Sequence, residues 1–289
     1  MAEQIQGIKR RMRSIGSTER ITNAMKLVSA SKLRKAKSVY EHSRSYLGRV
    51  LESIEEVFDA QDKIPKEYLV GTRSISNSCY IVITGSSGLC GSFNGNVIRK
   101  VDETVSDACN GTKVVTIGSK GREHFENRRY EIIDKHDPPA DTMDYDAVIE
   151  MAEPLMDKYL KGEIDEIILV YTSYINSLKQ EVIEERILPV DIESRNCKVS
   201  NNVSDAEFEP SIDEVFEYLM YKYLEMNIYS AVIEYATCEH AARRQAMESA
   251  NESAENMLNV LKIKYNHARQ TQITDEIIEI VSGAEAQNG

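Results

Sequence analysis

The sequence predicts a small α/β domain between two long terminal helices that pair as an antiparallel coiled coil. Two observations predict this fold class. The stretch that follows Pro210 contains no proline, and no glycine before Gly283, so nothing in it requires a helix to end. Between the two terminal stretches, short apolar runs alternate with segments of helical periodicity, as in a mostly parallel sheet covered by helices.

Residues 211–289 are expected to form one C-terminal helix. Its apolar or small residues recur at steps of mostly three and four, at Ala246, Ala250, Ala254, Met257, Leu261, Tyr265, Ala268, Ile273, Ile277, Ile280 and Ala284. With a rise of about 1.5 Å per residue, a continuous helix over 211–284 would reach roughly 110 Å, whereas a small domain is ~30 Å wide. A helix of this length has to lie against another long helix or another protein.

Residues 1–59 contain no proline and are expected to form the second long helix. The helix opens on an amphipathic stretch with three- and four-residue steps, at Ile5, Ile8, Met12 and Ile15. Beyond Gly16 the expected seam becomes small and polar, at Thr18, Thr22, Met25, Ser29, Lys32 and Ala36. Such a seam suits a helix that packs against one slim partner, so the two ends of the chain are expected to pair.

Residues 79–192 are expected to form the α/β domain, of Rossmann-like type, with linkers at 60–78 and 193–210. Buried-strand runs are expected at 80–84, 113–117, 131–134, 166–171 and 182–190. Helices are expected at 93–106, 119–128 and 144–160.

The net charge of −12 is divided unevenly along the chain. Residues 1–50 hold twelve Lys or Arg and three Asp or Glu, whereas the remaining residues hold 23 and 44. A basic arm on an acidic body is expected to meet a negatively charged partner. No run of 18 apolar residues is present, and the polar start of the chain has no signal-peptide core, so neither a membrane span nor secretion is expected.

No catalytic, cofactor or metal site is expected. The five cysteines lie far apart without a CxxC pair, and the five histidines form no HxxH or HExxH set, so free thiols are expected rather than metal or disulfide frameworks. Gly85, Gly88 and Gly91 follow a strand and precede a helix, as in phosphate-binding turns. They match neither the dinucleotide fingerprint nor the P-loop. Cys90 could act as a nucleophile at a helix N-terminus, but no base accompanies it.

Two other classes of protein fit parts of this pattern. The first is a coiled-coil scaffold or nucleic-acid-binding protein with an α/β domain, which would bind with a steep salt dependence. Residues 1–39, however, contain no aromatic side chain on which bases could stack. The second is a nucleotide-binding α/β enzyme with helical extensions, which would show nucleotide affinity as an isolated chain.

Three blocks of sequence carry a family resemblance. They are the helix segment 21–36 (ITNAMKLVSASKLRKA), the loop at 88–94 (GLCGSFN) and the terminal segment 265–284 (YNHARQTQITDEIIEIVSGA). In order and spacing the chain resembles the gamma subunit of the F-type rotary ATP synthase. This resemblance implies a non-catalytic shaft inside a ring of three alpha and three beta subunits, turned by an ion-driven ring of c subunits. The α/β domain is expected to hold the epsilon subunit and the c-ring.

The resemblance also implies which residues meet partners. Contacts with the beta subunit are expected at Met25, Lys26, Cys90, Arg269, Gln270 and Thr274. The shaft tip, with Ile273, Ile277, Ile280 and Val281, is expected to sit in an apolar collar. The family implies no cofactor, no nucleic acid and no small-molecule substrate, and a place on the cytoplasmic face of the bacterial plasma membrane. One departure concerns the loop, where Ser86 and Ser87 replace the Asp-Arg pair usual in the family, so an ionic contact there is not expected.

Overall fold

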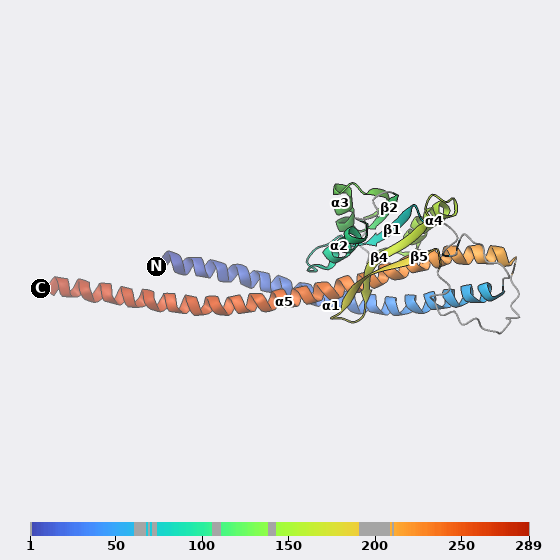
Figure 1. Cartoon of the computed structure of the whole chain (residues 1–289). Coiled ribbons are helices and arrows are strands. Elements are labelled where there is room, and N and C mark those ends of the chain that lie inside the picture. The colour runs from blue at the N-terminus through green and yellow to red at the C-terminus, as the bar shows by residue number, and fades with distance from the viewer. Residues whose placement is uncertain are drawn as a thin grey trace. The chain divides into compact units, whose positions relative to one another are not determined.

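The computed structural model describes residues 2–60, 74–105, 111–137, 143–190 and 211–288, together with positions 68, 70 and 209. The chain divides into two compact units, one of residues 1–30 with 243–289 and the other of residues 31–242. Two long helices, α1 (Ala2–Ala60) and α5 (Ile212–Asn288), contribute to both units (Figure 1). The predicted linkers, 60–78 and 193–210, lie mostly outside the described residues.

The second unit contains a five-stranded sheet with the strand order β3-β2-β1-β4-β5. The strands are β1 (Ser78–Ile83), β2 (Thr112–Ile117), β3 (Glu131–His136), β4 (Glu166–Tyr174) and β5 (Gln180–Leu188). The first four run parallel, and β5 returns antiparallel to β4. The sheet is therefore mostly parallel, as predicted, and the predicted last strand begins two residues earlier than expected.

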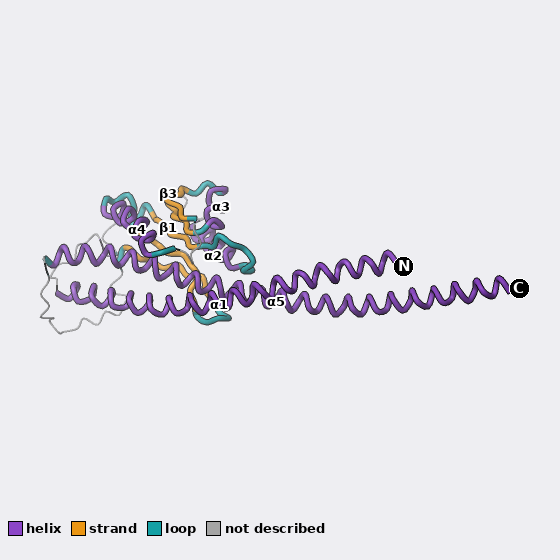
Figure 2. Tube along the Cα trace, turned by 180° about the vertical axis from the view of Figure 1, so that it is seen from behind, coloured by secondary structure: helices purple, strands orange, loops and turns teal. Residues whose placement is uncertain are grey.

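Three short helices, α2 (Phe93–Val105), α3 (Ser119–Asn127) and α4 (Tyr145–Leu160), pack on this sheet (Figure 2). Helices α2 and α3 cover one face, where Val97 and Phe125 join strand residues in a single apolar cluster. Helix α4 and the parts of α1 and α5 that belong to this unit cover the opposite face. Because both faces are covered, the central strands consist of apolar runs rather than alternating polar and apolar residues.

The local signals explain where these elements begin and end. Asp144 caps α4 by accepting a hydrogen bond from the Ala147 N–H at 3.0 Å. Gly118 precedes α3 with φ of 91°, a left-handed conformation that a side chain would strain. The three described cysteines, Cys79, Cys90 and Cys238, are buried free thiols.

Candidate rotor surface and glycine loop

In the first unit, α1 and α5 run antiparallel in one constant register. Lys9 lies over the ring of Tyr265, with its ammonium nitrogen 5.5 Å from the ring centroid. Farther along, Thr22 donates a hydrogen bond to Asn251 at 3.4 Å, and the Lys26 ammonium lies 3.8 Å from a Glu248 carboxylate oxygen. In each of these three pairs the residue numbers of the two partners add up to 273 or 274. In an antiparallel pair a constant sum means that the register does not change between these levels.

The buried and half-buried positions of α1 in this unit include a regular three-four alternation. It starts at Ile5 and passes through Ile8, Met12, Ile15, Glu19, Thr22, Lys26 and Ser29. The predicted polar seam is thus present, and Thr22 and Ser29 are buried at 7% and 3% exposure. Two of the predicted positions are wrong, because Thr18 and Lys32 are exposed, whereas the next residues, Glu19 and Leu33, are half-buried and buried.

In α5, too, one predicted seam position differs from the observed one. Ala254 and Met247 are buried, and the predicted position Met257 is 55% exposed. The next residue, Leu258, is half-buried instead. A continuous three-four alternation explains the shift, since a step of four from Ala254 leads to 258.

Many large apolar side chains of the first unit are exposed. They are Ile21, Leu27, Val28, Met257, Val260, Ile263, Ile273, Ile277, Ile278, Ile280 and Val281. Exposed apolar surface of this extent is typical of a protein that is covered by partners. On the α1 side this surface is interspersed with exposed basic side chains, at Lys9, Arg10, Arg11, Arg13 and Arg20.

The end of α5 extends beyond its partner helix. In the observed register, residues 273–288 have no α1 residue at their level, which leaves about 24 Å of single helix. Figure 1 shows the C-terminal end passing the N-terminal end of α1. The predicted tip residues Ile273, Ile277, Ile280 and Val281 lie on this single helix and are 46–71% exposed.

The structure places the predicted contact residues of the first unit at two levels. Met25 and Lys26 are half-buried, with Lys26 beside Glu248, whereas Arg269, Gln270 and Thr274 are exposed near the tip. The helical rise puts about 32 Å between the levels of Glu248 and Arg269. The Thr274 hydroxyl donates to the Gln270 carbonyl oxygen at 3.0 Å, within its own helix.

In the second unit, the glycine loop (residues 85–91) joins β1 to α2. Cys90 is only 5% exposed, and its neighbour Leu89 is 61% exposed with a positive φ of 63°. The N–H of Gly85 is engaged by the Asn94 side-chain oxygen at 2.9 Å. Within the described residues no cluster of His, Cys, Asp or Glu could hold a metal ion.

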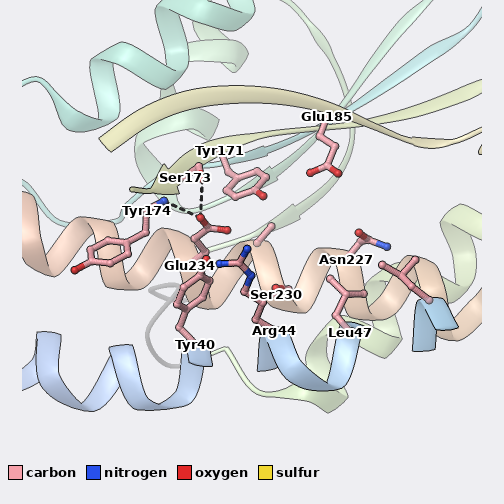
Figure 3. A pocket seen from close by; sticks show the side chains of 12 residues that line it. Tyr40, Arg44, Leu47, Tyr171, Ser173, Tyr174, Glu185, Asn227, Ser230 and Glu234 are labelled. Atoms are coloured by element: carbon pink, nitrogen blue, oxygen red, sulfur yellow. Dashed lines mark hydrogen bonds between the residues drawn. The ribbon is translucent and has the colours of Figure 1, made fainter. Parts of the chain in front are cut away.

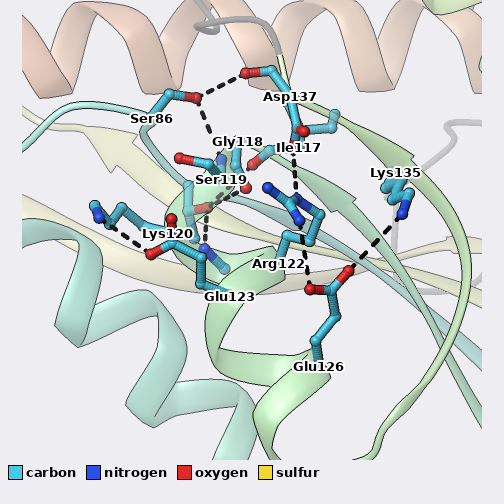
Figure 4. Close-up of polar contacts among 12 residues, drawn as sticks. Ser86, Ile117, Gly118, Ser119, Lys120, Arg122, Glu123, Glu126, Lys135 and Asp137 are labelled. Atoms are coloured by element: carbon cyan, nitrogen blue, oxygen red, sulfur yellow. Dashed lines mark hydrogen bonds and ion pairs between the residues drawn. The ribbon is translucent and has the colours of Figure 1, made fainter.

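Ser86 takes part in a polar network beside the start of α3 (Figure 4). Its hydroxyl donates to the Asp137 carbonyl oxygen at 2.9 Å and accepts from the Ser119 N–H at 3.2 Å. Arg122 donates to the Asp137 carboxylate at 2.7 Å. This serine therefore fastens the glycine loop to its own domain.

A cavity of about 610 Å³ lies between α1, β4, β5 and α5 within the second unit (Figure 3). At its wall the Glu234 carboxylate, 7% exposed, accepts hydrogen bonds from the Ser173 hydroxyl and the Tyr174 N–H, both at 2.7 Å. Burial, and after it the nearby Glu234 carboxylate, raises the pKa of Tyr40. The two hydrogen bonds to Glu234 join the end of β4 to α5.

Residues 4–287 match the family model described as ATP synthase. A gamma chain from Acetobacterium woodii, named sodium ion specific, is 36% identical over 304 residues and covers all of both chains. The gamma chain of Moorella thermoacetica is 35% identical over 96% of this chain and 97% of its own. The chain belongs to the ATP synthase gamma chain family.

Solved structures support the same fold for this gamma family member. A chain of the Euglena gracilis mitochondrial ATP synthase covers 99% of it, with a TM-score of 0.70 and 18% identity. A chain from the central stalk and c-ring structure of the Tetrahymena thermophila enzyme covers 80% of it, with a TM-score of 0.60 and 21% identity. The predicted fold class is confirmed. None of the helices within the described ranges combines the length and apolar character needed to cross a bilayer.

Sequence reasoning missed some of the residues that organise this gamma chain. The alternation that starts at Ile5, if continued past Gly16, would have placed Glu19 in the seam. The motif at 88–94 contains Asn94, but no local signal pointed to its bond with Tyr235 or to Glu234, because these partners lie far apart in the sequence.

Proposed function

We propose that this chain is the central rotor shaft of an F-type ATP synthase. It would couple ion-driven rotation of a membrane c-ring to the conformational cycle of the beta-subunit catalytic sites. The observation that carries the proposal is the paired-helix unit of a gamma family chain, with exposed apolar side chains along it and a single-helix tip beyond it. Monomeric soluble proteins rarely expose this much apolar surface, so we expect other subunits to cover it.

The mechanism we infer is differential contact rather than bond chemistry. The two helices present different side chains on different sides. Each of the three otherwise alike beta subunits therefore contacts a different surface of the shaft. A body that binds one conformation of a subunit better than another shifts its equilibrium toward that conformation. Rotation then moves each catalytic site through its states in turn, and catalysis belongs to the beta subunits.

The seam holds the two helices together as one turning body. Its small and polar residues, such as Thr22 and Ser29, join the helices without a broad apolar face. The exposed basic side chains of α1 suit acidic segments of the surrounding subunits, and salt would screen this attraction.

The individual contacts are part of the proposal. The beta subunits would meet Met25, Lys26, Arg269, Gln270 and Thr274, and also the loop of Cys90, whose own side chain is buried. An apolar collar of the ring would hold Ile273, Ile277, Ile280 and Val281. The alpha and beta subunits, the epsilon subunit and the c-ring are the proposed partners. The proposed location is the cytoplasmic face of a bacterial plasma membrane, as a peripheral part of the complex.

Co-expression with the alpha and beta subunits of the same organism tests the function. A tag on beta should co-purify the chain at about one copy per three beta subunits, and deletion of residues 273–289 should lower ATP hydrolysis. A matched variant that keeps the length but replaces Ile273, Ile277 and Ile280 by serine separates loss of apolar contact from loss of helix. Failure of the full-length chain to join the complex would contradict the rotor function, and unchanged turnover in both variants would contradict the tip contacts.

A further inference from the structure

Asn94, in the first turn of α2, gathers the glycine loop around its side chain. Its side-chain oxygen accepts hydrogen bonds from the Gly85 N–H at 2.9 Å and from the Tyr235 hydroxyl at 2.7 Å. Its amide nitrogen donates to the Ser87 carbonyl oxygen at 3.4 Å and to the Cys90 sulfur at 3.6 Å. One side chain thus joins the beginning, middle and end of the loop to α5.

The loop and α5 also meet by close packing. A Cβ atom on Gly85 would lie 2.8 Å from a Glu239 carboxylate oxygen and 3.0 Å from the Tyr235 hydroxyl, so a side chain there would push these groups away from the loop. The rings of Phe93 and Tyr235 are 5.1 Å apart between centroids. Hydrogen bonding and packing therefore converge on Tyr235.

The backbone at the tip of the loop is strained. Leu89 adopts a φ of 63°, which is uncommon for a residue with a branched side chain, yet its side chain is 61% exposed. Strain of this kind persists only where surrounding interactions hold it, and it gathers at functional segments. The bonds of Asn94 to Gly85, Ser87 and Cys90 hold both sides of Leu89.

We infer that Asn94 is a positioning residue, which keeps the glycine loop in the shape that presents Leu89 and fastens it to the shaft helix α5 through Tyr235. The functional part of this inference rests on the proposed rotor role. In a rotor the sheet domain is driven and α5 must follow, so each bond between them carries load. The hydrogen bond between Asn94 and Tyr235 is of this type at the loop, and the hydrogen bond between Ser173 and Glu234 is of this type at the β4–β5 hairpin.

The first test measures opening of the loop in the isolated chain. Alkylation of Cys90 is followed by peptide mass spectrometry, with Cys79 and Cys238 of the same unit as internal standards for global opening. Asn94→Ala should speed alkylation of Cys90 about tenfold, since several hydrogen bonds, most of them partly buried, are lost together, and leave the two standards unchanged. Asn96→Ala, on the same helix, is the matched control, because its side-chain oxygen accepts only a surface bond from Arg99.

A double substitution tests whether the residues act through one bond. Tyr235→Phe removes only the hydroxyl that reaches Asn94 and should also speed alkylation of Cys90. The effects of Asn94→Ala and Tyr235→Phe should then be less than additive, as for residues in direct contact. An unchanged Cys90 rate, or equal acceleration at all three cysteines, would overturn the positioning role.

The last test uses the assembled complex. In Asn94→Ala, ATP hydrolysis without load should stay near the native rate, whereas rotation against a large viscous load should slow about twofold, because one of several contacts with α5 is lost. Equal loaded speeds in native and Asn94→Ala complexes would overturn the load-bearing part. Failure of the native chain to assemble would contradict the rotor function alone, since the alkylation tests do not depend on it.

Discussion

The ammonium nitrogen of Lys26 lies 3.8 Å from a carboxylate oxygen of Glu248, across the seam between α1 and α5. The two side chains are 29% and 46% exposed, so solvent screens the pair. The paired helices are therefore held mainly by their continuous seam, and the charge pair adds little. A weak pair also leaves Lys26 able to exchange its partner for an acidic group of another subunit.

The first prediction concerns this pair. A double-mutant cycle with Lys26→Met and Glu248→Gln should give a coupling energy of about 0.2–1 kcal/mol. The coupling should shrink at high salt, because screening acts on exposed charges. The measurement is the free energy of unfolding of the isolated chain, followed by helical circular dichroism at low and high salt. A coupling that does not change with salt would show that the pair is shielded from solvent.

The second prediction tests the phase of the seam. Glu19→Leu should stabilise the pairing of the helices by about 1 kcal/mol or more, because a half-buried charged residue gives way to apolar area at the seam. Thr18→Leu is the matched control, since Thr18 is exposed and should leave the unfolding midpoint almost unchanged. Thermal unfolding monitored by circular dichroism distinguishes the two. Stabilisation by Thr18→Leu but not by Glu19→Leu would show that Thr18, and not Glu19, lies in the seam.

The third prediction concerns the junction of β1, β2 and α3. Gly118 has a φ of 91°, and a Cβ there would lie 2.0 Å from the Thr84 carbonyl oxygen. Gly118→Ala should cost about 3 kcal/mol or more, from backbone strain together with the clash. Gly88→Ala should change stability by no more than about 0.5 kcal/mol, since a Cβ there meets nothing within 4 Å. Denaturant unfolding of the two variants checks this difference, and equal costs would contradict it.

The fourth prediction concerns alkaline pH. Burial, then the Glu184 and Glu166 carboxylates, raises the pKa of Tyr80 to about 12. In the unfolded chain a tyrosine ionises near pH 10. The raised pKa therefore contributes stability that is complete below about pH 10 and is lost as the pH rises toward 12. Tyr80→Phe should make the loss of stability between pH 10 and 12 less steep.

Denaturant midpoints measured from pH 8 to 12 check this prediction. Tyr218→Phe, at a tyrosine that is 61% exposed, serves as the control and should leave the slope at its native value. Cys79, buried in the same sheet, has its pKa raised to about 12 by burial and contributes in the same direction. An identical slope in Tyr80→Phe and native protein would show that Tyr80 does not contribute.

Much of the fold could be predicted from local signals. The apolar run at β1 marks a strand, and Asp144 marks the start of α4. The contacts could not be predicted in the same way, because each joins residues that are distant in sequence. Asn94 meets Tyr235 across 141 positions, and Ser173 meets Glu234 across 61.

The sequence by itself determined the two long helices, the order of strands and helices between them, and the family. These features depend on properties that each segment carries alone: the absence of proline, the spacing of apolar residues and the motifs at 21–36, 88–94 and 265–284. Only the tertiary structure decided that Asn94 ties the loop to α5 through Tyr235, and that Glu234 joins α5 to the end of β4. The physical reason is that polar residues are buried only where a particular partner satisfies them, and that partner is known only once the chain has folded.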